Sequence, residues 1–139
     1  MLRGLTTVSF FADDLDAARA WYTSLLGIEP YYVTPGYVEF RVGDYLHELG
    51  IVDRRYSPHP ESPDGSTSSG AAGVVIYWHV DDVALALERL LAMGAVEHQG
   101  VIDRGEGFLT ASVVDPFGNV LGVMYNPHYL DVLSSRAQP

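Results

Sequence analysis

Cysteine is absent from this chain of 139 residues. Disulfide bonds, zinc sites built on thiolates and cysteine nucleophiles are therefore excluded. No stretch comes near the roughly 18 consecutive apolar residues that cross a bilayer, so we expect no membrane partner. The first residues lack the long apolar core of a secretion signal, and we expect a cytoplasmic location.

Basic residues are also few. Lysine and arginine together number 8 against 18 acidic residues, which gives a formal net charge of -10. A surface with this balance repels nucleic acid and anionic membranes, so neither is expected as a partner. The chain is long enough to bury a sizeable core, and we expect a single domain over residues 1–139.

The most informative feature that is present is an internal repeat. Residues 8–18 and residues 76–86 both run from an apolar segment through an Asp-Asp pair into an amphipathic segment. The Asp-Asp pair at 81–82 follows the pair at 13–14 by 68 positions, and a glycine ends each amphipathic segment. A repeat of this size predicts a fold built from two similar units.

The first module, about residues 5–52, has the pattern of a strand, a helix and three further strands. Its first strand ends before Asp13, whose carboxylate is expected to cap the helix. Apolar residues at helical spacing continue as far as Gly27, where a glycine can take the left-handed conformation that ends a helix. Glycine-containing turns then separate strands expected near 28–33, 37–42 and 45–52.

The second module, about residues 73–125, repeats this order, with strands expected near 73–80, 95–102, 108–114 and 119–125. Its helix follows Asp81 or Asp82. The Pro/Ser-rich segment 53–72 between the modules is expected to be a linker or a flap. The tail, residues 126–139, carries apolar residues that favour a short docking helix. Together these patterns predict an α+β fold of two βαβββ modules.

Several motifs give this arrangement a family resemblance. They are the two Asp-Asp helix starts, Trp21-Tyr22 before Leu26-Gly27, and the turn Asp115-Pro116-Phe117-Gly118-Asn119. With the two modules, they resemble the vicinal oxygen chelate superfamily, which includes glyoxalase I, extradiol dioxygenases, and fosfomycin- and bleomycin-resistance proteins. The resemblance covers about residues 5–125 and implies curled mixed sheets around a cavity. It also implies a homodimer, with a monomer that pairs its own two modules as the alternative.

Enzymes of the family that this chain resembles hold a divalent metal in that cavity. Their His, Gln or Glu ligands come from the first and fourth strands of each module. In the family, these ligands lie at a fixed spacing from the aspartate that starts each helix and from the glycine of the final turn. The same spacing in this chain places Thr7, Val75 and Gly122 at three of the four ligand positions. Valine and glycine side chains offer no donor atom, and one threonine hydroxyl is a poor anchor for a cation. We therefore expect no metal site of the usual kind, and no other cofactor.

The fourth metal position falls at His47 or Glu48. Strand neighbours point to opposite faces, and His47 shares its face with apolar residues suited to helix packing, so Glu48 is expected to face the cavity. In the second module, His79 shares a strand face with Tyr77. His79 is either a strand-end histidine satisfied by backbone or water, or a ligand contact or general base.

These arguments predict a glyoxalase/bleomycin-resistance-like protein that binds a small aromatic or amphipathic molecule, because strand tyrosines favour flat ligands. The predicted ligand-binding residues are Glu48, His79, Tyr77, Thr7 and Tyr37, and no catalytic residue is identified. The competing hypothesis is an enzyme. In one version it is a lyase or dioxygenase whose altered metal site uses Glu48 or His47 with His79, and in the other a metal-free acid–base catalyst.

Overall fold

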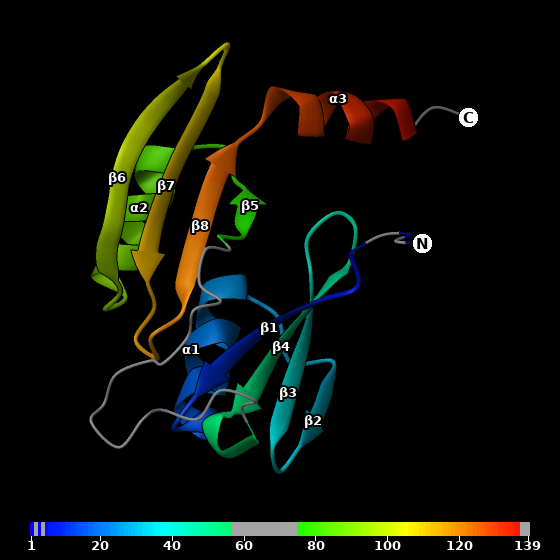
Figure 1. Cartoon of the computed structure of the whole chain (residues 1–139), viewed down its shortest axis with the longest axis vertical. Helices are drawn as coiled ribbons and strands as arrows, with labels where there is room; N and C mark the ends of the chain where they lie inside the picture. Colours follow the sequence, from blue (N-terminus) through cyan, green and yellow to red (C-terminus); the bar gives the residue numbers. More distant parts are fainter. Residues whose placement is uncertain (2, 4, 57–74, 137–139) are drawn as a thin grey trace. The chain divides into compact units, whose positions relative to one another are not determined.

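The computed structural model describes residues 1, 3, 5–56 and 75–136 (Figure 1). The chain divides into two compact units, residues 1–72 and 73–139. From residue 57 to residue 72, the segment predicted to be a linker or a flap lies outside the described residues. The single-domain organisation stays a prediction.

The first unit is a four-stranded mixed sheet with one long helix. In chain order it contains β1 (Thr7–Ala12), α1 (Leu15–Leu26), β2 (Tyr32–Thr34), β3 (Tyr37–Val42), β4 (His47–Asp53) and the 3-10 helix η1 (Arg54–Tyr56). The strand order is β1-β4-β3-β2. The β1–β4 pair is parallel and the other two pairs are antiparallel.

The second unit repeats this topology and adds a helix at its end. It contains β5 (Tyr77–His79), α2 (Val83–Ala92), β6 (Val96–Gly105), β7 (Phe108–Val114), β8 (Val120–Tyr125) and α3 (Pro127–Arg136). The strand order is β5-β8-β7-β6, with β5 parallel to β8. The predicted α+β fold of two βαβββ modules is confirmed, and each sheet is open rather than closed into a barrel.

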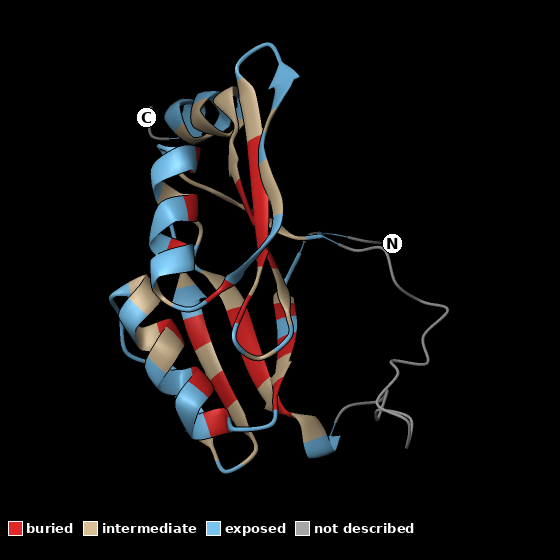
Figure 2. Cartoon of the chain, turned by 90° about the vertical axis from the view of Figure 1, so that its left-hand side faces the viewer, coloured by how far each residue is buried: buried red, intermediate tan, exposed pale blue. Residues whose placement is uncertain are grey.

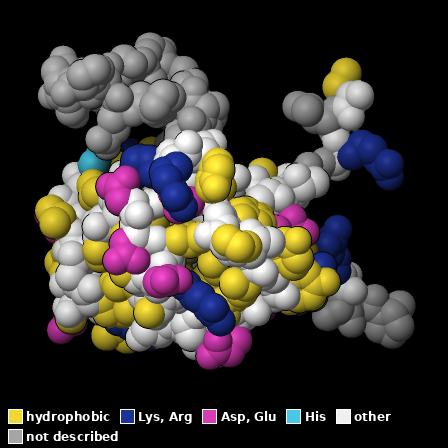
Figure 3. All heavy atoms as spheres, turned by 90° about the horizontal axis from the view of Figure 1, so that it is seen from below, with side chains coloured by type: hydrophobic (Ala, Val, Ile, Leu, Met, Phe, Trp, Pro, Cys, Tyr) yellow, Lys and Arg dark blue, Asp and Glu magenta, His cyan; other side chains and the backbone are white. Residues whose placement is uncertain are grey.

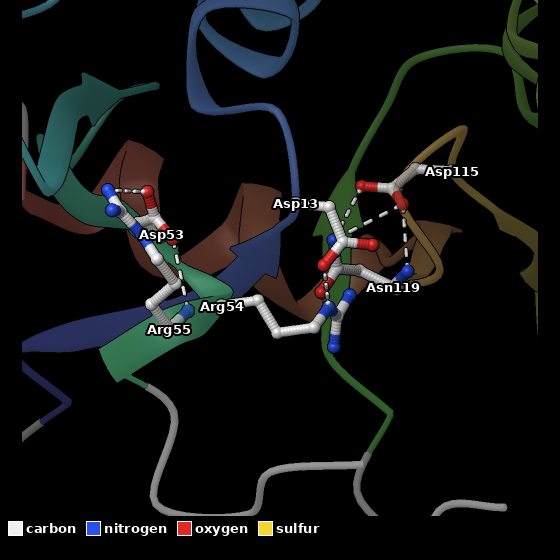
Figure 4. A network of polar contacts seen from close by, with 6 residues as sticks. All are labelled: Asp13, Asp53, Arg54, Arg55, Asp115 and Asn119. Atoms are coloured by element: carbon white, nitrogen blue, oxygen red, sulfur yellow. Dashed lines mark hydrogen bonds and ion pairs between the residues drawn. The ribbon is translucent and has the colours of Figure 1, made fainter. Parts of the chain in front are cut away.

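Both Asp-Asp pairs start a helix, and in each pair the second aspartate is the cap. Asp14 and Asp82 each accept a hydrogen bond from the backbone amide three residues further on, at 3.0 and 2.9 Å. The prediction of Asp13 as the cap was wrong, because the helix begins one residue later, at Leu15. The carboxylate of Asp13 instead pairs with the Arg54 guanidinium at 2.9 Å (Figure 4).

Each sheet buries one face against the helix of its own unit. In the first unit, Tyr22 of α1 is 1% exposed, and its ring centroid lies 6.2 Å from that of Phe10 and 6.5 Å from that of Phe40. Figure 2 shows the buried positions alternating with less buried ones along the strands. The buried side chains of the second unit include Leu87, Leu90, Ala111, Val113, Leu121 and Val123. The other face of each sheet stays open within its unit and carries the predicted site residues.

The second strand is shorter than predicted. The sequence predicts a strand near 28–33, whereas β2 contains only Tyr32–Thr34. Pro30 has no amide hydrogen to donate to a strand ladder, so regular pairing starts after it. The shortness of β2 leaves Tyr31 and Tyr32 exposed at one edge of the sheet.

The end of β4 carries an ion pair that makes stability depend on pH. Asp53 Oδ2 lies 2.8 Å from Arg55 Nη2, and the hydrogen bonds from Arg55 lower the pKa of Asp53 (Figure 4). The ionised carboxylate therefore stabilises the folded state above the ordinary carboxyl pKa of about 4, and this contribution is lost as the pH falls through the lowered pKa.

We expect Arg55→Gln to lower the thermal midpoint at neutral pH. The difference from the unmodified protein should shrink as the pH falls below about 4, because the Asp53 carboxylate then becomes protonated in both proteins. Thermal unfolding followed from neutral to acid pH measures this difference. Arg19→Gln, an exposed arginine of α1, is the control for the loss of one positive charge. A difference that stays constant with pH would show that the ion pair does not cause it.

Candidate functional site

The open face of the first sheet brings together the predicted site residues of that unit. Leu49 and Ile51 are buried on the helix side of β4, so strand alternation turns Glu48 and Gly50 to the open face. Polar and aromatic side chains from β1, β3 and β2 share this face. In cross-strand register the face contains three rows: Thr7–Glu48–Arg41, Ser9–Gly50–Glu39–Tyr32, and Phe11–Val52–Tyr37–Thr34.

Thr7 and Glu48 form a hydrogen-bonded pair across β1 and β4. The Thr7 hydroxyl donates to Glu48 Oε2 at 2.7 Å, and both side chains are half-buried. Strand alternation puts His47 on the opposite face, where its ring centroid lies 5.7 Å from that of Tyr45. The pair with Thr7 holds the carboxylate of Glu48 in one orientation on the open face.

Tyr37 lies across the centre of the same face. Its ring covers Gly50 so closely that a Cβ atom at position 50 would lie 2.6 Å from Tyr37 Cε2. Its hydroxyl donates to Glu39 Oε1 at 2.6 Å. Burial, the hydrogen bond to Glu39 and the negative charges of Glu39 and Glu48 raise the pKa of Tyr37, so the phenol stays protonated and remains a donor.

The sequence does not predict Glu39 and Arg41 as site residues. Both alternate with Tyr37 along β3 and therefore lie on its face. Counting in steps of two from Tyr37 would have found them. The Arg41 guanidinium lies 3.8 Å from the centre of the Tyr31 ring. The face thus offers two carboxylates beside tyrosine rings, which is an environment suited to an ammonium or hydroxyl group of a ligand.

The open face of the second sheet also has a tyrosine ring over a glycine. Tyr77 of β5 pairs with Gly122 of β8. A Cβ atom at position 122 would lie 2.6 Å from Tyr77 Cδ1 and 2.7 Å from the backbone oxygen of Ile76. The Tyr77 ring therefore occupies the space in which a side chain at position 122 would start. Val75, before β5, is 37% exposed.

His79 lies on the face of Tyr77 and connects β5 to the C-terminal helix. Its Nδ1 accepts a hydrogen bond from the Asn126 amide at 3.2 Å, so a neutral ring carries its proton on Nε2. The ring stacks on that of Tyr129 in α3, with centroids 4.7 Å apart and planes at 11°. Its Nε2 is buried and lies 3.5 Å from Asp81 Oδ1. The structure thus gives His79 a backbone partner, and its contact with a ligand stays a prediction.

The described residues do not fit the metal site of the enzymes that the chain resembles. At the ligand positions expected from the family, the first unit supplies one carboxylate, that of Glu48, and the Thr7 hydroxyl already donates a hydrogen bond to it. The second unit has Val75 and Gly122 there, and a tyrosine ring covers Gly122. Among residues 1, 3, 5–56 and 75–136, no three or more His, Asp or Glu side chains gather as a metal site would require.

The surface charge is mixed on the side drawn in Figure 3. Acidic and basic side chains are interspersed there with hydrophobic ones. Such mixing gives that side no field of a single sign. Within the described part of the chain, no helix combines the length and the apolar character needed to cross a membrane.

The comparison with known families identifies the fold. The model of the Glyoxalase/Bleomycin resistance protein/Dioxygenase superfamily matches residues 4–123. The chain belongs to this superfamily. The resemblance to the vicinal oxygen chelate proteins, drawn from the repeat and the final turn, is confirmed. No curated protein matches the sequence.

Solved structures of superfamily proteins share this fold. A glyoxalase-related enzyme from Fulvimarina pelagi has a TM-score of 0.68 at 20% identity, covering 91% of this chain and 90% of its own. A lactoylglutathione lyase from Agrobacterium tumefaciens has a TM-score of 0.65 at 25% identity, covering 88% and 93%. A glyoxalase/bleomycin resistance protein/dioxygenase from Nocardioides has a TM-score of 0.62 at 18% identity, covering 90% and 84%. The superfamily includes proteins with different activities, so the site must decide the function.

Proposed function

We propose that this superfamily member binds a small aromatic or amphipathic molecule on its open sheet faces, without the divalent metal of related enzymes. The observation that carries the proposal is the pair of tyrosine rings laid over glycines, Tyr37 over Gly50 and Tyr77 over Gly122. At Gly122 the ring fills the space that a metal-binding side chain would need. Both tyrosines are half-buried, and an aromatic ring with a phenol edge is a good surface for a flat ligand.

The carboxylates of the first unit support a ligand with a basic or hydroxyl group. Glu48 accepts one hydrogen bond from Thr7, and Glu39 accepts one from Tyr37. A carboxylate has about four acceptor positions, so each retains capacity for a donor on the ligand. The raised pKa of Tyr37 keeps its hydroxyl bonded to Glu39 at neutral pH. A protonated amine over this face would meet carboxylate oxygens and aromatic edges together.

The proposal predicts that Glu48→Gln weakens the binding of a basic aromatic molecule. Metal-free bleomycin and tryptamine are suitable probes because both combine aromatic groups with positive charge. We expect the affinity to fall about tenfold or more, since a charge-assisted hydrogen bond is replaced by a neutral one. Isothermal titration calorimetry at low salt measures the change. Glu29→Gln, which neutralises an exposed glutamate of the same unit, should bind as the unmodified protein does.

Two results would contradict the proposal. One is the absence of binding of both probes to the unmodified protein. The other is stoichiometric iron, manganese, nickel or zinc in protein purified without chelator. The second result would favour the competing hypothesis of a lyase or dioxygenase with an altered metal site.

The proposal retains three expectations. His79 and Tyr77 contact the ligand from the second unit. The protein is a homodimer, which light scattering coupled to gel filtration would test. It works in the cytoplasm, which cell fractionation would test.

A further inference from the structure

Arg104 lies at the β6 side of the second unit, on the sheet face that also carries Tyr77 and His79, and two neutral side chains hold its guanidinium. Its Nε donates to Thr110 Oγ1 at 3.0 Å, and its Nη2 lies 3.3 Å from Gln99 Oε1. Thr110 is only 2% exposed, so the anchoring hydroxyl is buried in the sheet. A guanidinium has five N–H donors, so three remain for another partner. No carboxylate pairs with Arg104 within the described ranges.

His98 is anchored beside Arg104 in the same way. Its Nδ1 lies 3.0 Å from the hydroxyl of Ser112, which is also 2% exposed. Thr110 and Ser112 are two residues apart on β7, so their side chains share one face with about 7 Å between them. The ring of His98 is exposed, and the Ser112 contact leaves its Nε2 as a second polar atom. Two buried hydroxyls therefore orient two exposed side chains: Thr110 orients the guanidinium of Arg104, and Ser112 orients the imidazole of His98.

The neighbouring acids of β6 lie on the other face. Glu97 pairs with Val113 and Asp103 pairs with Leu109, and both partners alternate with Ser112 and Thr110 along β7. The carboxylate of Asp103 also accepts a hydrogen bond from the Gly105 amide at 2.8 Å. The positive charge of Arg104 is thus not neutralised across its own face. This is unexpected in a chain with 18 acidic and 8 basic residues.

We propose that Arg104 and His98 form a binding site for an oxyanion, the carboxylate or phosphate group of a small molecule. The held guanidinium presents its remaining donors as a fork, which matches two oxygens of such a group, and His98 Nε2 supplies a third contact. Gln99 and Thr110 keep the fork in place without neutralising it. The side chains that build the site come from β6 and β7, and none of them is a residue named for the function proposed above, although the site shares the open face of the second sheet with Tyr77 and His79.

The test uses the full chain and two aromatic anions, phenyl phosphate and benzoate, with benzyl alcohol as the neutral analogue. Nuclear magnetic resonance titration at low salt follows the backbone amides of β6 and β7 and the Arg104 Nε–H signal. We expect saturable shifts with one or both anions and none with the alcohol. Arg104→Gln should weaken the binding about tenfold or more, as for the loss of a bidentate charged contact. Tighter binding of one anion identifies the group.

Two further variants make the test specific. Arg104→Lys should also weaken binding, because an ammonium cannot bond Thr110 and still present a planar fork. Arg19→Gln on α1 changes the net charge as Arg104→Gln does and should leave binding unchanged. The proposal is overturned if neither anion shifts these signals, if Arg104→Lys binds as tightly as the unmodified protein, or if Arg19→Gln weakens binding as much as Arg104→Gln. Thermal unfolding confirms that each variant is folded.

Discussion

Replacing Gly122 with glutamate is expected to destabilise the protein by about 3 kcal/mol and to produce no metal site. The substitution restores the residue type that related enzymes use at this position. In this chain the new Cβ would lie 2.7 Å from the backbone oxygen of Ile76 and 2.6 Å from the Tyr77 ring. Backbone cannot move aside as a side-chain end can, and a buried carboxylate without a partner adds its own cost. Urea unfolding measures the stability, and calorimetry with Zn²⁺ or Ni²⁺ tests for a metal.

Three glycine-to-alanine changes separate the effect of close packing from the loss of glycine itself. Gly122→Ala should lose most of the stability that Gly122→Glu loses. At Gly50→Ala the nearest atoms are those of the Tyr37 ring and hydroxyl, which can swing away from Glu39, so we expect a loss of about 1–2 kcal/mol. Gly100→Ala should change stability by less than about 0.5 kcal/mol, because its nearest contact would be an ordinary 3.6 Å to Glu97 Oε1.

The order of these losses decides the interpretation. Equal losses in all three variants would mean that backbone freedom, not the tyrosine rings, explains the glycines. A folded Gly122→Glu protein that binds zinc tightly would show that the metal site needs only one missing side chain. That result would contradict the argument that the Tyr77 ring leaves no space for a metal-binding side chain at position 122.

The fold could be predicted because its signals are local and occur twice. An aspartate cap, an apolar stripe at helical spacing and a terminating glycine mark each helix, and the predicted end of the first helix at Gly27 is confirmed. The errors lie where one residue changes the hydrogen bonding. Either aspartate of the first pair could cap the helix, and the sequence alone does not show that Asp14 does so and not Asp13. Pro30 delays the regular pairing of β2, an effect that the apolar pattern of residues 28–33 does not reveal.

The site could be predicted only where strand alternation is regular. β4 pairs without interruption, so the argument from Leu49 and Ile51 placed Glu48 on the face of Thr7. β6 has register shifts between Glu97 and Gln99, between Gln99 and Ile102, and between Asp103 and Gly105. Counting in steps of two fails across such bulges. Nothing in the sequence therefore pointed to His98 and Arg104 as neighbours on one face.

Asp115→Ala is the second change for which we expect a large effect. Asp115 is 3% exposed, and its carboxylate accepts a hydrogen bond from the Phe117 amide at 2.9 Å. It also accepts one from the Asn119 amide at 2.7 Å (Figure 4). The Asn119 side chain donates to it as well, at 3.0 Å. Alanine would leave these donors without their acceptor in the turn between β7 and β8, at a cost of about 3 kcal/mol.

Two further variants show whether the carboxylate, and not merely the residue, is needed. Asp115→Asn keeps one acceptor oxygen and should lose about 1–2 kcal/mol. Asp103→Ala removes an exposed carboxylate with one backbone donor and should lose less than about 1 kcal/mol. Urea unfolding with a common slope gives all three values. If Asp115→Ala is no more damaging than Asp103→Ala, the turn does not depend on its carboxylate. If Asp115→Ala is the more damaging change, the Asp-Pro-Phe-Gly-Asn turn stabilises the β7–β8 pairing, in which Ser112 lies opposite Gly122.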